Sequence, residues 1–242
     1  MTLRARWPSQ SGGLSRSAAP ETLLCAIVVA GQLAFWCGLC LAARRYPSEY
    51  DWRYMTISSL LYSDRDPEGH GLAQTGVVLS GLAGLAWALA LAARRPTWIL
   101  AFGYGCMAVA AAVPQGLGHI RKSHEVLSVA AFLALCIGLA RLTVATGSGS
   151  PVTVRRRTPR ARLLAALAFA PIALAAVSQA YVYGAQPHLP WVSLAWRARG
   201  IPAYLSFAFW QWIACALYSL YALGLSYHEI ALILRRNKLI SQ

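Results

Sequence analysis

The chain has 242 residues, of which 57% are hydrophobic and 12% charged, and its formal net charge at pH 7 is +14. Because a soluble domain carries about 25% charged residues, this composition excludes an ordinary water-soluble domain. A run of about 20 apolar residues crosses the ~30 Å hydrocarbon core of a bilayer as a helix. We therefore predict an all-α, polytopic membrane protein with six transmembrane helices in one bundle. The positive charge fits loops that meet anionic lipid, and we expect no nucleic-acid partner.

Residues 1–21 are rich in Ser, Gly and Arg, which is typical of a disordered basic segment. A six-helix transmembrane domain is expected over residues 22–227. Its spans are predicted at residues 23–43, 72–93, 98–117, 125–145, 163–183 and 202–227. Pro171 falls inside the fifth span, where membrane helices tolerate proline. Residues 228–242 are predicted to form a basic cytoplasmic tail.

The distribution of Lys and Arg predicts the orientation. With six spans both termini share one side, and that side, which includes Arg155, Arg156 and Arg157, has more Lys and Arg than the other. Cytoplasmic loops carry such an excess. We therefore predict a multi-pass protein of the cell membrane with both termini in the cytoplasm, and with most acidic residues on the outer side.

The connector at residues 50–70 is the one long polar segment that lies between two apolar runs and also carries many ionisable and aromatic residues. Ser48 together with Asp51 fits a capping box. This pattern predicts a short helix over residues 51–62 that lies in the membrane interface, with its apolar side chains facing lipid or the top of the bundle.

Two further helix starts are suggested by capping residues. Asp66 precedes Pro67, and an acidic N-cap followed by proline at the first helical position is typical of a helix start. Ser123 is expected to cap the fourth span in the same way, which would leave residues 118–124 in a loop.

The predicted topology gathers ionisable and hydroxyl side chains at the outer rim, where we expect a polar pocket. The candidate residues of this pocket are Arg53, Ser58, Ser59, Asp64, His70, His124 and Arg199. The expected role is the binding of a lipid headgroup or of a partner protein whose identity the sequence does not give. Arg199 would contact phosphate or carboxylate, because Arg binds such groups in a bidentate manner.

Two other functions stay open at this point. Ser58 or Ser59 beside a histidine can form a nucleophile pair, so one alternative is a membrane-embedded hydrolase, metal-dependent or serine-type, that acts on a lipid. The other is a small-molecule transporter, although the spans carry almost no charge at the depth where transporter sites usually lie.

A metal site is not specified by the sequence. Zinc ligation by His70, His119, His124 or His188 with an acid is chemically reasonable, but the spacing does not require it, so we predict no metal and no cofactor. All six Cys fall within apolar runs, and we expect no disulfide because a disulfide framework needs cysteines in the oxidising compartment.

Three stretches carry a resemblance to a known family. They are YDWRYMTISSL at 50–60, HEVLSVAAFLAL from His124, and WRARG at 196–200 before a Trp-rich last helix. Together they resemble a bacterial and archaeal six-helix membrane family of unknown function, distantly similar to the eukaryotic Frag/DRAM-type proteins. The resemblance covers residues 22–227 and implies six helices and a first outer loop of interest, without a reaction. The chain departs from the family pattern at Leu61, where the family has Gly, and at Ala198, where it has an acid.

Overall fold

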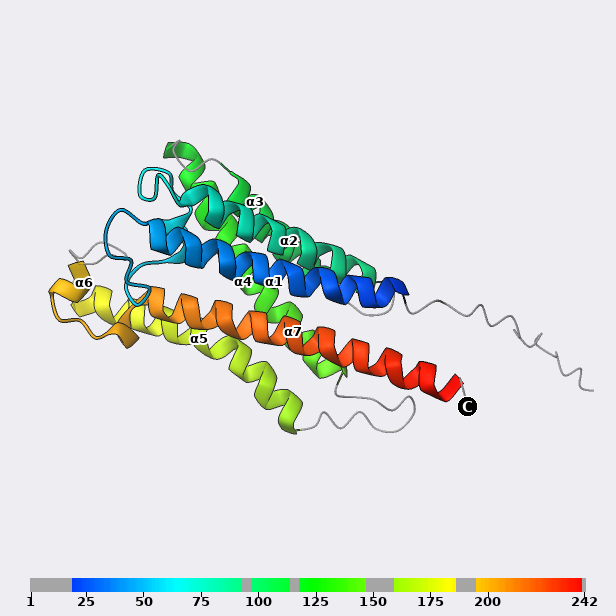
Figure 1. Cartoon of the computed structure of the whole chain (residues 1–242). Coiled ribbons are helices and arrows are strands. Elements are labelled where there is room, and N and C mark those ends of the chain that lie inside the picture. The colour runs from blue at the N-terminus through cyan, green and yellow to red at the C-terminus, as the bar shows by residue number, and fades with distance from the viewer. Residues whose placement is uncertain (1–18, 93–96, 114–117, 147–158, 186–194, 241–242) are drawn as a thin grey trace, which may run out of the picture.

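The computed structural model describes residues 19–92, 97–113, 118–146, 159–185 and 195–240 (Figure 1). Every regular element in this part of the chain is a helix. The α-helices are α1 (Ala19–Arg45), α2 (His70–Ala92), α3 (Trp98–Ala112), α4 (Gly118–Thr146), α5 (Pro159–Ala185), α6 (Ala195–Ala198) and α7 (Phe207–Ile240), and two 3₁₀ turns are η1 (Ile57–Leu60) and η2 (Ala203–Leu205). The predicted all-α class is therefore confirmed.

Four helices of the described part are long and apolar enough to cross a membrane. These segments are Thr22–Arg45, His70–Ala92, Ser123–Leu142 and Phe207–Tyr227. The apolar helical segments Trp98–Ala112 and Phe169–Val182 are shorter. At 1.5 Å per residue, the 15 residues of α3 reach about 22 Å. The chain thus has the helices of a membrane protein, and the structure gives full spanning length to four of them.

Small residues bring α1 and α2 into close contact. A Cβ atom added at Gly38 would lie 2.6 Å from the carbonyl oxygen of Leu72 and 3.1 Å from the Cα of Gly76. Helices in a bilayer associate through such close packing, because lipid supplies no hydrophobic drive between them. The largest cluster of buried hydrophobic residues includes Trp87 of α2, Leu100 of α3 and Leu139 of α4.

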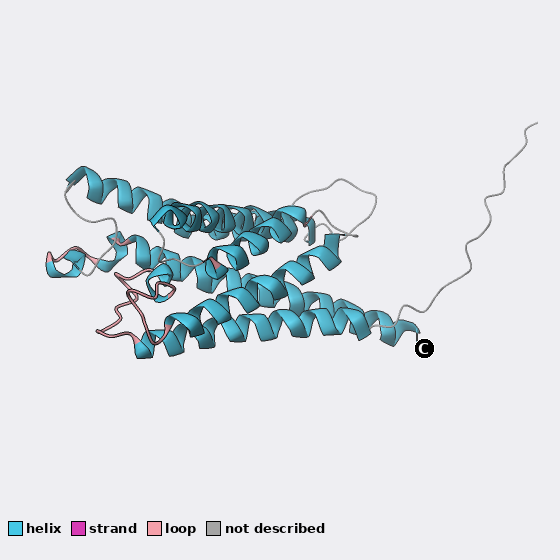
Figure 2. Cartoon of the chain, turned by 90° about the horizontal axis from the view of Figure 1, so that it is seen from above, coloured by secondary structure: helices cyan, strands magenta, loops and turns pink. Residues whose placement is uncertain are grey.

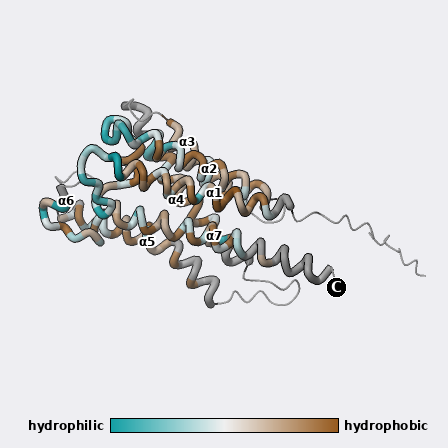
Figure 3. The backbone as a smooth tube through the Cα atoms, in the orientation of Figure 1, coloured by the Kyte–Doolittle hydropathy of each residue, from teal (hydrophilic) through white to brown (hydrophobic). Residues whose placement is uncertain are grey.

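The polar connectors gather at one end of the bundle. The described loops lie largely at the end away from the C-terminus (Figure 2), and the hydrophilic residues concentrate there, whereas the helices are mostly hydrophobic (Figure 3). The beginning of α1 and the end of α7 lie together at the opposite end (Figure 1). The segment between α1 and α2 therefore meets the segment that precedes α7.

The predicted helix over residues 51–62 is wrong. Within that range the chain forms turns and the short η1. The capping box is absent because Asp51 accepts hydrogen bonds from the side chain and backbone N–H of Arg53. Most apolar side chains of this segment face the bundle, since Tyr54, Ile57 and Leu60 are buried, whereas Trp52 is exposed. We call residues 50–61 the cap segment.

Of the two helix caps predicted at Asp66 and Ser123, the structure confirms the first and not the second. Asp66 makes the expected N-cap bond, because its Oδ1 accepts the N–H of Gly69 at 2.9 Å. Ser123 is not a cap, since α4 already begins at Gly118. The first polar turn and a half of α4 precedes its apolar run, so the apolar pattern alone placed the start of this helix too late.

Candidate functional site

Ser58 and His124 are 66 residues apart in sequence and meet at the capped end of the bundle. Ser58 belongs to η1, and His124 lies in the second turn of α4. The Oγ atom of Ser58 is 3.2 Å from Nε2 of His124. His124 is only 2% exposed, and the ring of Tyr62 meets its ring edge-on with 5.9 Å between the centroids. The cap segment thus contributes a hydroxyl group to a buried imidazole.

The contact that Nδ1 of His124 makes decides whether Nε2 donates or accepts a hydrogen bond. Its Nδ1 is 2.8 Å from the carbonyl oxygen of Ala110 in α3. A carbonyl oxygen only accepts, so Nδ1 carries a hydrogen, and Nε2 of the neutral ring is an acceptor. The hydroxyl of Ser58 donates to it, and the hydroxyl of Ser128, one turn further along α4, lies within 3.4 Å of the same nitrogen.

This arrangement has the geometry of a serine beside a general base. In a Ser-His-Asp triad a carboxylate holds Nδ1–H of the histidine and so points Nε2 at the serine. Here the backbone carbonyl of Ala110 takes that position. It orients the ring in the same way but adds no negative charge to stabilise an imidazolium ion. The pair can therefore bind a polar group directly, and its capacity as a base is weaker than that of a full triad.

A cavity of about 90 Å³ opens beside this pair, between α1, α2, α3, α4 and α7. Its walls are mainly apolar, and Phe35 and Phe132 are among them. No Asp, Glu, Lys or Arg lines it in the described part of the chain. A water molecule needs about 10–15 Å³ by this kind of measure. The cavity therefore has room for several waters or for one small, uncharged polar group.

The cavity reaches from the capped end to about the middle of the spans. Gln32 and Ser80 line it and lie near the centres of α1 and α2, where the side-chain amide of Gln32 donates to Ser80 Oγ at 3.2 Å. Tyr218 of α7 lines the same region. Polar side chains at membrane depth are costly and commonly mark functional sites. These residues continue the polar character of the site into the bundle.

Gln211 joins the cap segment to the cavity. Its side-chain carbonyl accepts the backbone N–H of Ile57 at 3.0 Å, and both residues are buried. Because the oxygen must face this N–H group, the orientation of the amide is assigned, and its NH₂ group remains as a donor. Gln211 also lines the cavity. A ligand at Ser58 therefore meets hydroxyl and imidazole groups as well as an amide donor.

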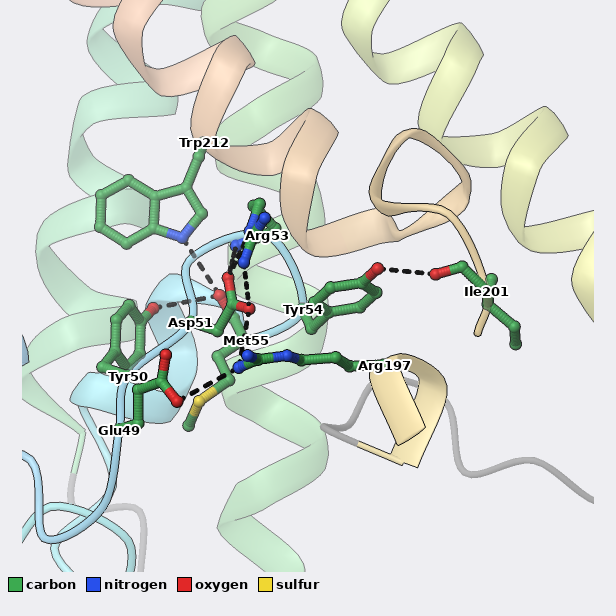
Figure 4. Close-up of polar contacts among 9 residues, drawn as sticks. All are labelled: Glu49, Tyr50, Asp51, Arg53, Tyr54, Met55, Arg197, Ile201 and Trp212. Atoms are coloured by element: carbon green, nitrogen blue, oxygen red, sulfur yellow. Dashed lines mark hydrogen bonds and ion pairs between the residues drawn. The ribbon is translucent and has the colours of Figure 1, made fainter. Parts of the chain in front are cut away.

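A second polar cluster holds the cap segment in place (Figure 4). The carboxylate of Asp51 is buried and accepts Nε and Nη2 of Arg53 at 2.8 and 2.9 Å. Arg197, from the segment before α7, lies 3.4 Å from the same carboxylate and 3.2 Å from that of Glu49. The hydrogen bonds from Arg53 lower the pKa of Asp51 below its ordinary value, although burial raises it. The cluster joins two connectors distant in sequence.

Aromatic side chains complete this attachment. The hydroxyl of Tyr54 donates to the carbonyl of Ile201 at 2.6 Å, and the indole N–H of Trp212 donates to the carbonyl of Met55 at 3.1 Å (Figure 4). The hydroxyl of Tyr50 lies 3.0 Å from the same Met55 oxygen. The cap segment is thereby attached to α7 and to the chain before it, which positions the following residue pair, Ile57 and Ser58.

Asp66 lies outside the cavity but is unusual. Its side chain is fully buried, Oδ1 accepts the N–H of Gly69, and Oδ2 has no hydrogen-bond partner in the described part of the chain. Burial raises the pKa of this carboxyl group. A Cβ atom at Gly69 would overlap the carboxylate, so glycine is needed at this position. This carboxylate caps α2, and neither Asp66 nor Gly69 lines the cavity.

The structure brings together only part of the predicted pocket. Ser58 and His124 are in contact and line the cavity, whereas Ser59 is buried, does not line the cavity and bonds to Thr56. The other candidates lie elsewhere: Arg53 pairs with Asp51, Asp64 and Arg199 are exposed, and His70 places its Nδ1 against the backbone oxygens of Asp66 and Pro67. The sequence-based list omitted Ser128, Gln211 and Ala110, which also belong to the site.

No group of three or more His, Cys, Asp or Glu suited to a metal ion occurs among the described residues. Two histidines considered for zinc fall outside this description, since His188 lies in the range 186–194 and the side chain of His119 is not described. His70 and His124 have different surroundings. The imidazole of His124 donates its Nδ1–H to the carbonyl oxygen of Ala110, and its Nε2 faces the hydroxyl groups of Ser58 and Ser128.

Comparison with known proteins gives no relative. No protein-family model, no curated protein and no solved structure matches this chain. The resemblance to the six-helix family with Frag/DRAM-type relatives therefore stays a prediction, and the functional argument depends on the geometry of the site.

Proposed function

We propose that this chain is a six-span membrane protein that binds a neutral lipid, with the small polar head of the lipid at Ser58 and His124. The observation that carries the proposal is the 3.2 Å contact between Ser58 Oγ and His124 Nε2, with Nδ1 held by Ala110, at one end of a cavity inside an apolar bundle. Small-molecule sites typically combine apolar walls with a few placed polar groups.

The uncharged lining selects the chemical class of the head. Burying an ionised group without an opposite charge is very costly, and the described lining has no Lys or Arg to meet a phosphate. A hydroxyl, ester or amide head instead finds a donor in the NH₂ group of Gln211 and hydroxyl groups at Ser58 and Ser128. Arg199 is exposed and does not line the cavity, so it supports no phosphate contact here.

The six-span arrangement is part of the proposal. Four segments have spanning length, and the apolar segments Trp98–Ala112 and Phe169–Val182 supply the third and fifth crossings. A short hydrophobic segment is accommodated by local thinning of the bilayer at modest cost. An even number of crossings agrees with the beginning of α1 and the end of α7 lying at the same end of the bundle (Figure 1). We propose that this end is cytoplasmic.

Binding is tested with the purified protein in detergent and a monoacylglycerol, by native mass spectrometry. Ser58→Ala removes the hydroxyl that lies in the cavity, and Ser59→Ala is its matched control, because Ser59 is a neighbouring buried serine that bonds to Thr56 instead. One neutral hydrogen bond contributes about 1 kcal/mol, so Ser58→Ala is expected to weaken binding roughly fivefold. Equal affinities for the two variants would contradict the proposal.

A serine-type hydrolase is the second candidate, favoured by the tautomer that Ala110 imposes on His124. In such a reaction Ser58 gives its proton to Nε2 and attacks an ester carbonyl, the alcohol leaves with that proton, and water then releases the fatty acid. Release of fatty acid from a bound monoacylglycerol, lost in Ser58→Ala and retained in Ser59→Ala, supports this candidate. Binding without release leaves the protein a lipid-binding protein.

A further inference from the structure

A second, larger hollow of about 490 Å³ lies along the side of the bundle, between α4, α5 and α7. Its lining is almost entirely apolar, and the residues that matter below are Phe132, Pro171, Ala176, Ala180, Trp210 and Gln211. An apolar lining of this kind is complementary to a hydrophobic occupant. The position of the groove decides which occupant that is.

The groove lies at the depth of the hydrocarbon core. Its lining residues come from the apolar segments Ser123–Leu142, Phe169–Val182 and Phe207–Tyr227. At one end the indole N–H of Trp210 donates to the carbonyl of Tyr204, at 2.7 Å. Trp is enriched where the hydrocarbon meets the headgroups, so this end of the groove lies near the membrane surface. In a bilayer, this groove therefore faces the hydrocarbon chains of the surrounding lipids.

The groove adjoins the cavity that contains Ser58, and the two spaces share lining residues. Phe132 of α4 and Gln211 of α7 line both spaces. Phe132 contacts the ring of Tyr218 with 6.0 Å between the centroids, and Gln211 accepts the N–H of Ile57, the neighbour of Ser58. One apolar and one polar side chain therefore form the wall between the hydrocarbon-depth groove and the polar end of the cavity.

The sequence of α5 helps to keep this side of the bundle open. Pro171 lies inside α5 and lines the groove. A proline within a helix removes one backbone hydrogen bond and bends the helix. The neighbouring groove positions of α5 carry the small side chains of Ala175, Ala176 and Ala180. Small residues at these positions leave volume that larger side chains would occupy.

We propose that the groove between α4, α5 and α7 is the lateral route by which a neutral lipid passes from the bilayer into the cavity. The hydrocarbon chain lies in the groove, and the head passes the wall of Phe132 and Gln211 to reach Ser58 and His124. This inference rests on the proposed binding of a neutral lipid and adds the occupant and the route. A phosphate head is excluded from the inner end by the same uncharged lining.

The test uses the full chain reconstituted in phosphatidylcholine liposomes with a monoacylglycerol that carries a photoreactive diazirine on its glycerol head, because the head is the part that enters the cavity. Cross-linked peptides are then mapped by mass spectrometry at increasing times after addition of the probe. The wild-type protein is expected to give cross-links first in the groove of α4, α5 and α7 and then in the cavity. Phosphatidylcholine carrying the same diazirine is expected to label the groove only.

Ala176→Trp fills the groove, and Val177→Trp is its control, because Val177 is 66% exposed on another side of α5 and does not line the groove. We expect Ala176→Trp to lose the cavity cross-links that the wild type has already formed at the same time point, and Val177→Trp to retain them. Ala180→Trp is the second blocking variant if Ala176→Trp is not monodisperse. Cavity labelling at the wild-type rate in both blocking variants would overturn the route.

The outcomes separate this inference from the proposed function. If Ser58→Ala weakens equilibrium binding and the blocking variants leave the labelling rate unchanged, the lipid binds but enters elsewhere, and the route is wrong. If Ser58→Ala and Ser59→Ala bind equally, the proposed function is wrong whatever the groove does. Loss of labelling in the control Val177→Trp to the same degree as in Ala176→Trp also overturns the route.

Discussion

Replacing Gln211 by Leu removes the hydrogen bond that attaches the cap segment to the wall of the cavity. In the wild type the side-chain oxygen of Gln211 accepts the N–H of Ile57 at 3.0 Å, and both residues are buried. Leu fills a similar space but offers no acceptor. The N–H of Ile57 is then a buried donor without a partner, which costs about 1–3 kcal/mol.

Hydrogen–deuterium exchange of the cap segment measures this loss directly. Exchange there reports the free energy of local opening, so a cost of about 1–3 kcal/mol corresponds to a roughly 5- to 150-fold faster exchange of residues 50–61. The matched control is Gln74→Leu. Gln74 donates to the carbonyl of Leu61 at 3.3 Å, and an under-satisfied carbonyl costs less than an orphaned N–H group.

This role of Gln211 is refuted if Gln211→Leu leaves the exchange of the cap segment at the wild-type rate. It is also refuted if Gln74→Leu accelerates exchange as much as Gln211→Leu does, because the effect would then come from any lost side-chain contact. Exchange in α5, which carries neither glutamine, serves as the internal reference for global stability in both variants.

Two other predictions concern the fold. Gly38→Ala forces a methyl group against the backbone of α2, and we expect it to destabilise the protein by about 1–3 kcal/mol, measured as a lower melting temperature. The control is Gly71→Ala, which is expected to leave the melting temperature almost unchanged because a Cβ there meets no atom within 4 Å. Because Arg53 lowers the pKa of Asp51, the stability that this pair contributes is present above the unfolded pKa of about 3.9 and is lost as pH falls through the lower folded value. Cap-segment exchange against pH is expected to show this acid-side step in the wild type and to lack it in Asp51→Asn.

Hydropathy predicted where the long apolar helices lie, because the apolar runs form both the buried core and the exposed apolar surface of these helices. Hydropathy placed the start of α4 too late, because residues 118–123, which include His119, Arg121 and Lys122, precede the apolar run and yet belong to the helix. The capping box at Ser48 and Asp51 misled for a different reason. The spacing fits a helix, but Asp51 gains more from two guanidinium groups than from capping.

The candidate site was predictable in its members more than in its geometry. Ser58 and His124 both stood in the predicted pocket, yet nothing in the sequence indicates that a serine of a connector meets a histidine of α4. Gln211 had a usable signal, because a glutamine within an apolar span is rare and costly. Ala110 had none, since it contributes through its backbone carbonyl, which every residue carries.

The imidazole of His124 is the group through which binding is most directly observed, by ¹⁵N NMR of histidine-labelled protein with His124→Gln used to assign the signal. We predict a neutral ring with the hydrogen on Nδ1, and a shift of the Nε2 resonance when monoacylglycerol is added but not when phosphatidylcholine is added. A hydrogen on Nε2 in the ligand-free protein, or an Nε2 resonance that neither lipid moves, would contradict this prediction.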